Sequence, residues 1–423
     1  MNLTIHRGTN QIGGSCIELA TESTRILLDI GLPLDFDKQS HDQQQTIVEQ
    51  AKSWCDGIDA IFISHYHQEH HGLLSVAPLN IPVYVTAGTE RMFHINAVFM
   101  KLRMSHILNL CLVEPARKVA SDISPDSTIT PAVPVRVGDI TITAFTVDHS
   151  AYDACAYLIE SGGKRVLYSG DIRLHGAKGS LYKNLPQNVD YLILEGTNIE
   201  KAKTIATESA IRKELVNCFS EEESFLNFIW CSGQNIDRLT NIFAAARAAH
   251  KTLVVDVYIA SVMEEIHKLN NKIPTPDSHG IRVLYTIPTD DQERANYYIH
   301  FGKNRVHPLE IRQNPGAFVL IVRPSMLRFL KQNLSVSNAN VVTSIWKEYE
   351  KDEMAFFSWV DERGFKRKQI HTSGHADQLS LIKLAEFINP KQIIPIHTEK
   401  KEVFKRIFGD KMVVLEDNEL LKV

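Results

Sequence analysis

The sequence predicts an α/β protein with two domains. Its first two hundred residues are rich in short strands, whereas residues 201–365 alternate strands with helices. Such alternation produces a parallel sheet that helices cover on both faces. From about Lys366 the chain returns to a strand, a helix and a strand. We therefore expect one domain built from residues 1–200 and 366–423, with a second domain, 201–365, inserted into it.

Apolar runs bounded by Gly and polar turns mark the strands of the first part. They are expected at Asn2–His6, Ser15–Ala20, Arg25–Ile30, Ile58–Ser64, Pro82–Thr86, Ile140–Val147, Ala154–Ile159, Arg165–Ser169 and Tyr191–Glu195. Apolar residues at helical spacing predict one helix among them, over Glu90–Ser105.

Helices and strands then succeed one another regularly. Strands are expected at Ser224–Cys231, Thr252–Val257, Arg282–Thr286, Ala317–Val322 and Asn340–Ser344. Helices are expected at Thr207–Cys218, Asn235–His250, Ala260–Leu269, Asp290–His300 and Ser325–Leu330. The last part should contain the strand Lys368–His371, the helix Asp377–Ile388 and the strand Gln392–Ile396.

Composition excludes several classes of protein. An apolar content of 44% and a charged content of 23% are ordinary for a soluble globular chain. A net charge of −4 argues against non-specific coating of nucleic acid. The six cysteines include no C-x-x-C pair and predict free thiols in a reducing compartment. Because no signal segment or membrane-length apolar run is present, we expect a cytoplasmic protein without membrane contact.

Four metal-capable side chains come after the predicted strand Ile58–Ser64, namely His65, His67, Glu69 and His70. An imidazole buried without a partner is costly, whereas neutral imidazole and carboxylate are usual ligands of Zn, Mn and Fe ions. The alternative is a polar surface loop that happens to hold histidines. The number and spacing of the four residues favour a metal site.

Other strand ends carry further candidates. His149, Asp171 and His397 each come after a predicted strand, and Asp29 lies near the end of another. A single His or Asp at such a position is more often a turn cap or a satisfied polar group. In this order, and together with the preceding cluster, these residues favour one shared site.

The order of these residues resembles that of the metallo-β-lactamase superfamily. The His-x-His-x-Asp-His signature of the superfamily is matched here by His65, His67, Glu69 and His70. The rest of the chain is similar to the β-CASP branch, the nucleic-acid hydrolases, because its motifs A, B and C are matched by Glu195, His375 and His397. The resemblance covers nearly the whole chain and looks most like ribonuclease J and its bacterial relatives. It implies an αββα sandwich with an α/β β-CASP domain inserted after motif A.

The resemblance also implies a cofactor and a reaction. Two divalent ions are expected, zinc first and manganese as the alternative. One would be held by His65, His67 and His149, the other by Glu69, His70 and His397, with Asp171 between them. His375 would be the general acid, and Glu195 would orient it. Asp29 would contact the metal ligands without contacting an ion itself. The expected reaction is hydrolysis of phosphodiester bonds in RNA or in single-stranded DNA.

Two departures from the family pattern matter. Glu69 stands where the family has Asp, which moves the carboxylate outward by one methylene. Metal ligation tolerates positional errors of only about ±0.2 Å, so the second ion is expected to bind differently or more weakly. The additional C-terminal domain of full-length ribonuclease J is not expected here, so its mode of assembly is not carried over and a homodimer stays an open option.

Two turns are candidates for phosphate contact. Ser232, Gly233 and Asn235 lie between a predicted strand and helix, in a turn similar to one that ribonuclease J places over the nucleotide. The alternative is an ordinary βα turn. The second turn contains His371, Ser373 and Gly374 and precedes the helix at Asp377, where backbone N–H groups can bind phosphate. The alternative for His375 is that it is only a neighbour of the N-terminal cap of this helix.

A basic run, Lys366, Arg367 and Lys368, lies just before the second turn. It predicts either a solvated face or a wall of a nucleic-acid channel.

Two other functions are compatible with the same residues. The first is a small-molecule metallohydrolase acting on a lactone or a thioester, against which the inserted domain and His375 argue. The second is a nucleic-acid-binding subunit whose metal site has decayed, which only Glu69 supports. Cleavage within a strand and cleavage from its 5′ end are both open.

Overall fold

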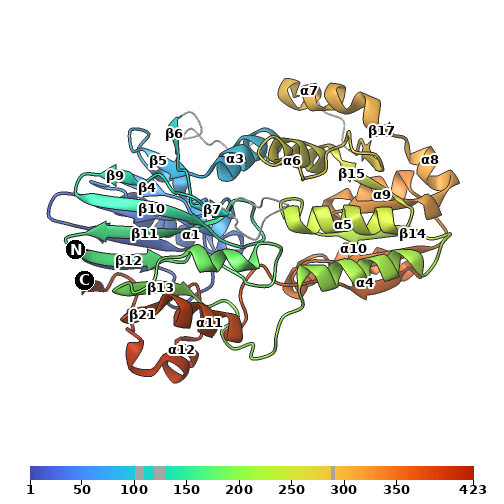
Figure 1. Ribbon diagram of the computed structural model, residues 1–423. Coiled ribbons are helices and arrows are strands. Elements are labelled where there is room, and N and C mark those ends of the chain that lie inside the picture. Colours follow the sequence, from blue (N-terminus) through green and yellow to red (C-terminus); the bar gives the residue numbers. More distant parts are fainter. Residues whose placement is uncertain (101–108, 119–128, 287–290) are drawn as a thin grey trace. The chain divides into compact units, whose positions relative to one another are not determined.

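The computed structural model describes residues 1–100, 109–118, 129–286 and 291–423. The chain forms two compact units (Figure 1). The first, which we call the sandwich unit, comprises Met1–His94, Arg103–Ile205 and Gly374–Val423. The second, the parallel-sheet unit, comprises Ile95–Leu102 and Ala206–Ser373. The sequence places the corresponding borders at 200/201 and 365/366.

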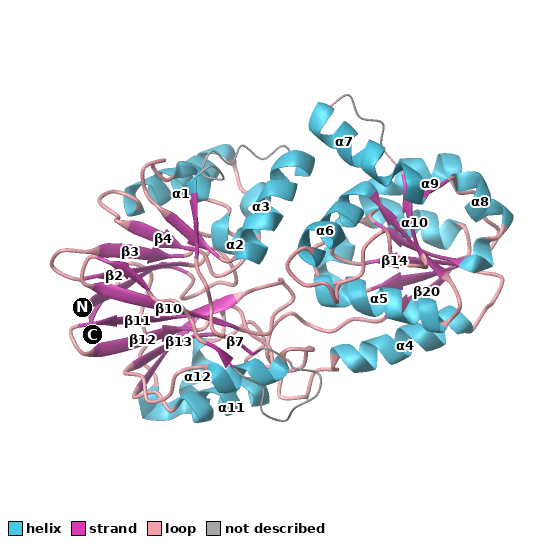
Figure 2. Cartoon of the chain, turned by 45° about the horizontal axis from the view of Figure 1, so that its top comes forward, coloured by secondary structure: helices cyan, strands magenta, loops and turns pink. Residues whose placement is uncertain are grey.

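Two sheets lie face to face in the sandwich unit (Figure 2). In the first sheet, the strands lie side by side in the order β22 (Leu420–Lys422), β1 (Asn2–Arg7), β2 (Cys16–Ala20), β3 (Arg25–Leu28), β4 (Ala60–Phe62), β5 (Val83–Val85) and β6 (Leu110–Leu112). In the second, the order is β21 (Gln392–Ile396), β13 (Tyr191–Glu195), β12 (Lys164–Tyr168), β11 (Cys155–Ser161), β10 (Ile140–Thr146) and β9 (Val135–Val137). A small separate ribbon pairs β7 (Arg117–Lys118) with β8 (Ile129–Thr130).

Helices cover the outer faces of both sheets (Figure 2). On the first sheet, α1 (His41–Trp54) packs its Trp54 ring on the side chains of His6 and Arg7. On the second sheet lie α11 (Gln378–Ile388) and α12 (Lys401–Phe408). The predicted αββα sandwich is therefore confirmed.

The core of the sandwich unit results from the alternation of its strands. In β1 and β10 every second side chain is buried, as expected for strands with one face on a core. Leu3, Ile5 and Phe62 from the first sheet share one buried cluster with Ile142 and Tyr157 from the second. Burial of these side chains between the sheets fixes the strand ends that carry the polar residues described below.

The parallel-sheet unit contains one sheet in which all pairings are parallel. The strand order is β17 (Arg305–Val306), β16 (Ile281–Leu284), β15 (Thr252–Asp256), β18 (Phe318–Val322), β14 (Leu226–Trp230), β19 (Ala339–Thr343) and β20 (Lys366–Gln369). Its helices are α4 (Glu208–Ser220), α5 (Ile236–Ala248), α6 (Val257–His267), α7 (Gln292–His300), α8 (Pro308–Gln313), α9 (Leu327–Asn333) and α10 (Met354–Glu362). The central strands are almost wholly buried, which is typical of a parallel sheet covered on both faces.

The structure differs from the predicted elements in some bounds, and it contains elements that were not predicted, among them α1, α8, α10, α12, β6, β9 and β22. The helix predicted over Glu90–Ser105 is α3 (Ala87–Met100), and positions 101–105 lie outside the described residues, as does Asp290. Helix α1 was not predicted, because its sequence is largely polar and it buries only Ala51 and Trp54. Its capping box, in which Ser40 and Gln43 cap one another, was the available signal. Within the described ranges, no helix combines the length and apolarity that crossing a bilayer requires.

Candidate active site

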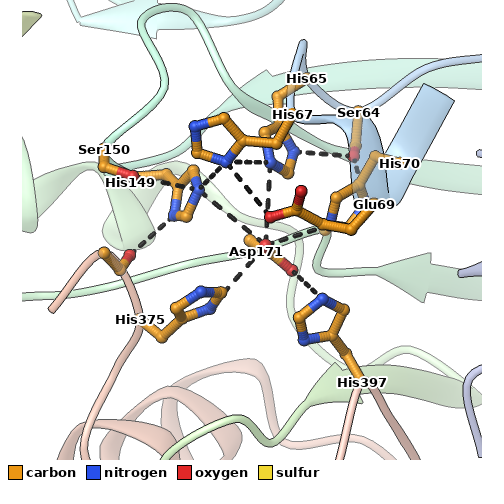
Figure 3. Close-up of polar contacts among 12 residues, drawn as sticks. Ser64, His65, His67, Glu69, His70, His149, Ser150, Asp171, His375 and His397 are labelled. Atoms are coloured by element: carbon orange, nitrogen blue, oxygen red, sulfur yellow. Dashed lines mark hydrogen bonds and ion pairs between the residues drawn. The ribbon is translucent and has the colours of Figure 1, made fainter. Parts of the chain in front are cut away.

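Metal-capable side chains from five loops of the sandwich unit meet around Asp171 (Figure 3). Four of the loops begin at the ends of β4, β10, β12 and β21, and the fifth leads into α11. Figure 3 shows the side chains directed toward Asp171: His65, His67, Glu69, His70, His149, His375 and His397. The structure thus brings the predicted histidine ligands together around Asp171. Glu69 reaches them through His67, and among the described residues it is in none of the groups whose atoms lie close enough to share an ion.

The distances around Asp171 are those of groups that could share ions. Its Oδ2 lies 3.0 Å from His70 Nε2, 3.7 Å from His65 Nε2 and 3.9 Å from His149 Nε2. Its Oδ1 lies 3.9 Å from His397 Nε2. Separations near 3.8 Å are too long for a hydrogen bond, but they suit two ligands that each approach one ion at about 2 Å.

Two atoms of this cluster test whether an ion fits. Asp171 Oδ1 and His397 Nε2 are buried and have no hydrogen-bond partner among the described residues. A buried polar atom without a partner is unfavourable by about 1–3 kcal/mol. An ion between these two atoms would satisfy both, so the donor set fits a divalent metal.

The imidazoles are oriented by hydrogen bonds on their outer sides. His149 donates from Nδ1 to the carbonyl of Gly374 at 2.7 Å, and His397 Nδ1 lies 2.8 Å from Thr197 Oγ1. Each contact leaves Nε2 directed at Asp171. Outer partners of this kind fix the tautomer and the ring orientation of metal-ligating histidines.

Asp29 orients His70 in the same way. Its carboxylate accepts hydrogen bonds from Ser64 N at 2.7 Å, Ser64 Oγ at 2.8 Å, His70 Nδ1 at 2.7 Å and Tyr168 Oη at 2.7 Å. Asp29 is fully buried and adopts a left-handed backbone with φ of 59°. Asp tolerates that conformation better than most residues.

Burial sets the protonation of the cluster. It lowers the pKa of His65 and of His149 well below the ordinary value, so both rings are neutral, as metal ligands must be. Burial also acts to lower the pKa of His70, but the carboxylates of Asp171 and Asp29 outweigh it and raise that pKa.

Glu69 is held by the backbone of its short helix α2 (Gln68–His71). Its carbonyl accepts from Ser15 N at 3.2 Å, and the neighbouring His70 carbonyl accepts from Ile30 N at 2.9 Å. A Cβ on Gly31 would lie 1.8 Å from the Glu69 carbonyl oxygen, so only glycine allows this close approach. The Glu69 carboxylate lies 3.7 Å from His67 Nδ1, and its side chain is 21% exposed.

His375 and Glu195 form a pair beside the cluster. His375 Nδ1 lies 3.2 Å from both carboxylate oxygens of Glu195. Glu195 also accepts from Ile172 N at 3.0 Å and Thr197 N at 3.2 Å. Burial acts to lower the pKa of His375, but Glu195 and Asp171 outweigh it and raise the pKa to about 9.

Two family models match the chain. Residues 24–221 match the beta-lactamase superfamily domain, and residues 362–407 match the Zn-dependent metallo-hydrolase RNA specificity domain. The two segments together span more than half of the sequence. The chain belongs to the β-CASP branch of the metallo-β-lactamase superfamily.

Several known proteins are similar to this chain over most of its length. An RNase J-like protein of Methanocaldococcus jannaschii is 24% identical over 434 residues, covering 94% of this chain and 92% of that protein. The ribonuclease J of Sinorhizobium meliloti is 22% identical, covering 81% of this chain and 58% of the relative, so this chain spans less than two thirds of that ribonuclease. A crystal structure of a protein of unknown function from Enterococcus faecalis V583 has the same fold, with a TM-score of 0.73, 19% identity and 99% of each chain covered.

Several supporting residues of this β-CASP site were not predicted. They are the hydroxyl residues Ser64, Tyr168 and Thr197, and the buried ion pair in which Arg173 donates to Asp148 at 3.1 Å. All of them lie within three residues of a predicted ligand or of Glu195. Proximity in sequence was thus the available signal, although serine, threonine and tyrosine are too common for it to be selective.

The first predicted phosphate turn lies in the parallel-sheet unit, between β14 and α5. Asn235 is the cap of α5 and accepts from Arg238 N at 3.0 Å. Ser232 Oγ accepts from Gln234 N at 3.3 Å. These contacts are those of an ordinary βα turn, which was the alternative for this segment. Gly233 lies within this turn.

The residues of the second turn fall in different units. His371 and Ser373 belong to the parallel-sheet unit, whereas Gly374 belongs to the sandwich unit, where its carbonyl orients His149. A Cβ on Gly374 would lie 2.7 Å from Ser150 Oγ. The cap of α11 is Asp377, which accepts from Ser380 N at 2.8 Å.

The basic run lies on the exposed edge strand β20. Lys366 pairs with Glu222 at 2.6 Å and Lys368 with Glu221 at 2.7 Å. The Arg367 guanidinium lies over the Phe357 ring at 4.3 Å. Charges on an edge strand also prevent pairing with other chains, so these contacts favour the solvated-face interpretation.

Proposed function

We infer that this protein is a metal-dependent hydrolase that cleaves phosphodiester bonds of RNA. The observation that carries the inference is the pair of buried, unpartnered atoms, Asp171 Oδ1 and His397 Nε2, inside a ring of imidazoles and carboxylates of the described chain. A site that leaves such atoms without partners is built for an ion. Relatives named as RNase J-like and ribonuclease J support RNA as the substrate class.

We propose two ion positions on either side of Asp171. His65, His67 and His149 would hold one ion, since His67 Nδ1 lies 3.1 Å from His65 Nε2 and 3.3 Å from His149 Nε2. Glu69, His70 and His397 would hold the other. The imidazole-rich donor set favours zinc over manganese. Divalent ions held by these residues would polarise the phosphate and lower the pKa of a water nucleophile.

The protein itself supplies the proton for the leaving oxygen. His375 presents Nδ1 to the Glu195 carboxylate, which leaves Nε2 to face the substrate. The negative charge of Glu195 keeps the imidazole protonated, and three further contacts on Glu195 hold the pair in place. An oriented imidazolium of this kind is a suitable general acid near neutral pH.

The phosphate can reach the cluster where its side chains are partly exposed. Most of the ligands are buried, but the side chains of His67, Glu69 and His375 are 22%, 21% and 18% exposed. These three side chains mark where a phosphodiester would enter.

The test is hydrolysis of labelled RNA by the full chain loaded with zinc or manganese. Substrates with a 5′-phosphate and with a 5′-hydroxyl are compared, and product sizes distinguish internal cleavage from 5′-end cleavage. Asp171→Asn is the control, because it removes the charge at the centre of both ion positions. Hydrolysis of chromogenic lactones or thioesters without RNA cleavage would instead identify a small-molecule hydrolase.

A further inference from the structure

A hollow lies at the carboxyl edge of the parallel sheet, within the parallel-sheet unit. It opens beside the ends of β15, β16 and β18 and has a volume of about 560 Å³ including its mouth. Strands β15 and β18 are neighbours, but the chain continues from β15 to β16 on one side and from β18 to β19 on the other. The carboxyl edge at such a reversal is where open parallel sheets bind ligands.

The walls of the hollow are aromatic. Phe99, Tyr258 and Tyr298 line it. The rings of Phe99 and Tyr258 have centroids 5.5 Å apart at an angle of 66°. The guanidinium of Arg323 lies over the Tyr258 ring at 5.3 Å, and that of Arg294 lies over the Phe99 ring at 6.0 Å. Tyr298 is therefore the ring on which a flat ligand, such as a nucleobase, would stack, because every base has a face that can stack.

The charge of the hollow is positive. Arg323 and Arg294 contribute two guanidinium groups and Asp256 one carboxylate. Arg323 Nε is buried without a hydrogen-bond partner in the described part of the chain, although another of its nitrogens pairs with Asp256. Arg294 donates to the carbonyls of Val98 and Phe99, and these neutral partners do not cancel its charge. The hollow therefore fits a ligand that is both aromatic and anionic.

Tyr258 connects the hollow to the turn after β14. Gln234 Nε2 donates to Tyr258 Oη at 2.8 Å, and Tyr258 Oη donates to Asn96 Oδ1 at 3.1 Å. A Cβ on Gly233 would lie 3.1 Å from the Tyr258 ring, so the turn packs directly against that ring. If a phosphate of an RNA strand lay at the backbone of Gly233, the next nucleotide of that RNA would lie beside the hollow.

We propose that this hollow binds one nucleotide of a single RNA strand, with the base against Tyr298 and the phosphate on Arg323. The proposal rests on the proposed RNA-cleaving function and adds to it a nucleotide subsite in the parallel-sheet unit. The same chemistry would also suit a free mononucleotide, and the experiment separates the two sources.

The test uses the full, metal-loaded chain and a short 5′-phosphorylated RNA with cleavage-resistant phosphorothioate linkages. Arg323→Gln and Tyr298→Ala should each weaken RNA binding about tenfold, as expected for loss of one phosphate contact or one stacked base. Arg247→Gln is the matched control, because its guanidinium lies over the Phe243 ring at 5.6 Å but outside the hollow. Metal content and melting temperature are measured for every variant. A 5-iodouridine photo-crosslink from RNA to Tyr258 or Tyr298 in the unaltered protein tests the site without any substitution.

Wild-type affinity of both variants for RNA, or crosslinks only elsewhere, would overturn the proposal. Binding of AMP that Arg323→Gln abolishes, with RNA affinity unchanged, would also overturn it and would identify a free-nucleotide site. Failure of the unaltered protein to cleave RNA would instead refute the proposed function. Cleavage by the unaltered protein with variants that bind RNA normally would refute the subsite alone.

Discussion

Asp29→Asn tests the role of the carboxylate that orients His70. Asparagine has the same shape and tolerates the positive φ of 59° at this position, so the substitution changes charge and hydrogen bonding alone. Three donors converge on Oδ2 and one, Ser64 N, on Oδ1. The asparagine oxygen is therefore expected to take the Oδ2 position, which leaves its NH₂ group facing the Ser64 N–H.

The magnitude can be worked out from those four hydrogen bonds. A bond to a charged acceptor contributes about 1.5–3 kcal/mol and a neutral one about 0.5–1.5 kcal/mol. Three bonds are weakened and one is lost, while the desolvation of a buried charge is relieved. We expect the sandwich unit to lose roughly 2–4 kcal/mol of stability, or roughly 4–16 °C in Tm at about 2–4 °C per kcal/mol. Metal affinity should fall about 10–100-fold, because His70 loses its fixed orientation.

The assay is metal competition against a chelator, together with thermal unfolding of the apo and loaded protein. Tyr168→Phe is the matched control, since it removes one of the four donors but keeps the Asp29 charge. It should lower metal affinity by less than Asp29→Asn does. If Asp29→Asn binds metal as tightly as the unaltered protein, His70 is not held in place by Asp29, and the reasoning fails.

Three further predictions concern other positions. His375→Ala should keep its metals, as measured by elemental analysis, while kcat falls about 10²–10⁴-fold; loss of metal would make His375 a ligand. Glu69→Asp should retain RNA hydrolysis, because its side chain lies at the exposed rim of the site; an inactive variant would show that the site depends on the longer side chain. Glu18→Gln tests an acid-labile contribution away from the metals. Burial acts to raise the Glu18 pKa, but hydrogen bonds from His6 and Arg25 outweigh it and lower the pKa from 4.5 to about 2. A depressed pKa contributes stability above the unfolded value, here up to about 3 kcal/mol. The Tm difference between wild type and Glu18→Gln should therefore be largest at neutral pH and shrink as pH falls from 4.5 to 2, and a difference independent of pH would refute this assignment.

The metal-capable side chains could be predicted from the sequence because the physics that places them is local. His149 and Asp171 come after the apolar strands β10 and β12. These strands run in the same direction on either side of β11, so their carboxyl ends lie at one edge of the sheet. Imidazole and carboxylate groups are also seldom fully buried unless they are paired with another group or with an ion. A polar residue directly after an apolar strand can be read from one stretch of chain, although the pairing of the strands cannot.

The supporting contacts could not be predicted because they join distant stretches. Tyr168 reaches Asp29 across 139 positions, and Gly374 reaches His149 across 225. The carbonyl that orients His149 belongs to the backbone and so has no residue signature at all. The basic run 366–368 shows the opposite difficulty: its charges are plain in the sequence, but the carboxylates that pair with them lie about 145 positions earlier.

The division of the sandwich unit has a consequence for how the protein is made. Tyr191 pairs with Gln392, about two hundred residues later, and His149 is oriented by Gly374. At about 5–20 residues per second, the ribosome needs roughly 10–40 s to synthesise the segment between the paired strands. During that interval His65, His67 and His149 are already present, whereas His397 and the carbonyl that fixes His149 are not. A nascent chain therefore already contains six of the seven predicted ligands, all but His397, and the complete centre forms only when synthesis is nearly finished. A chain that ends after the parallel sheet would lack strand β21 of the second sheet and His397 of the metal site. Synthesis of the last fifty residues is therefore needed to complete the site.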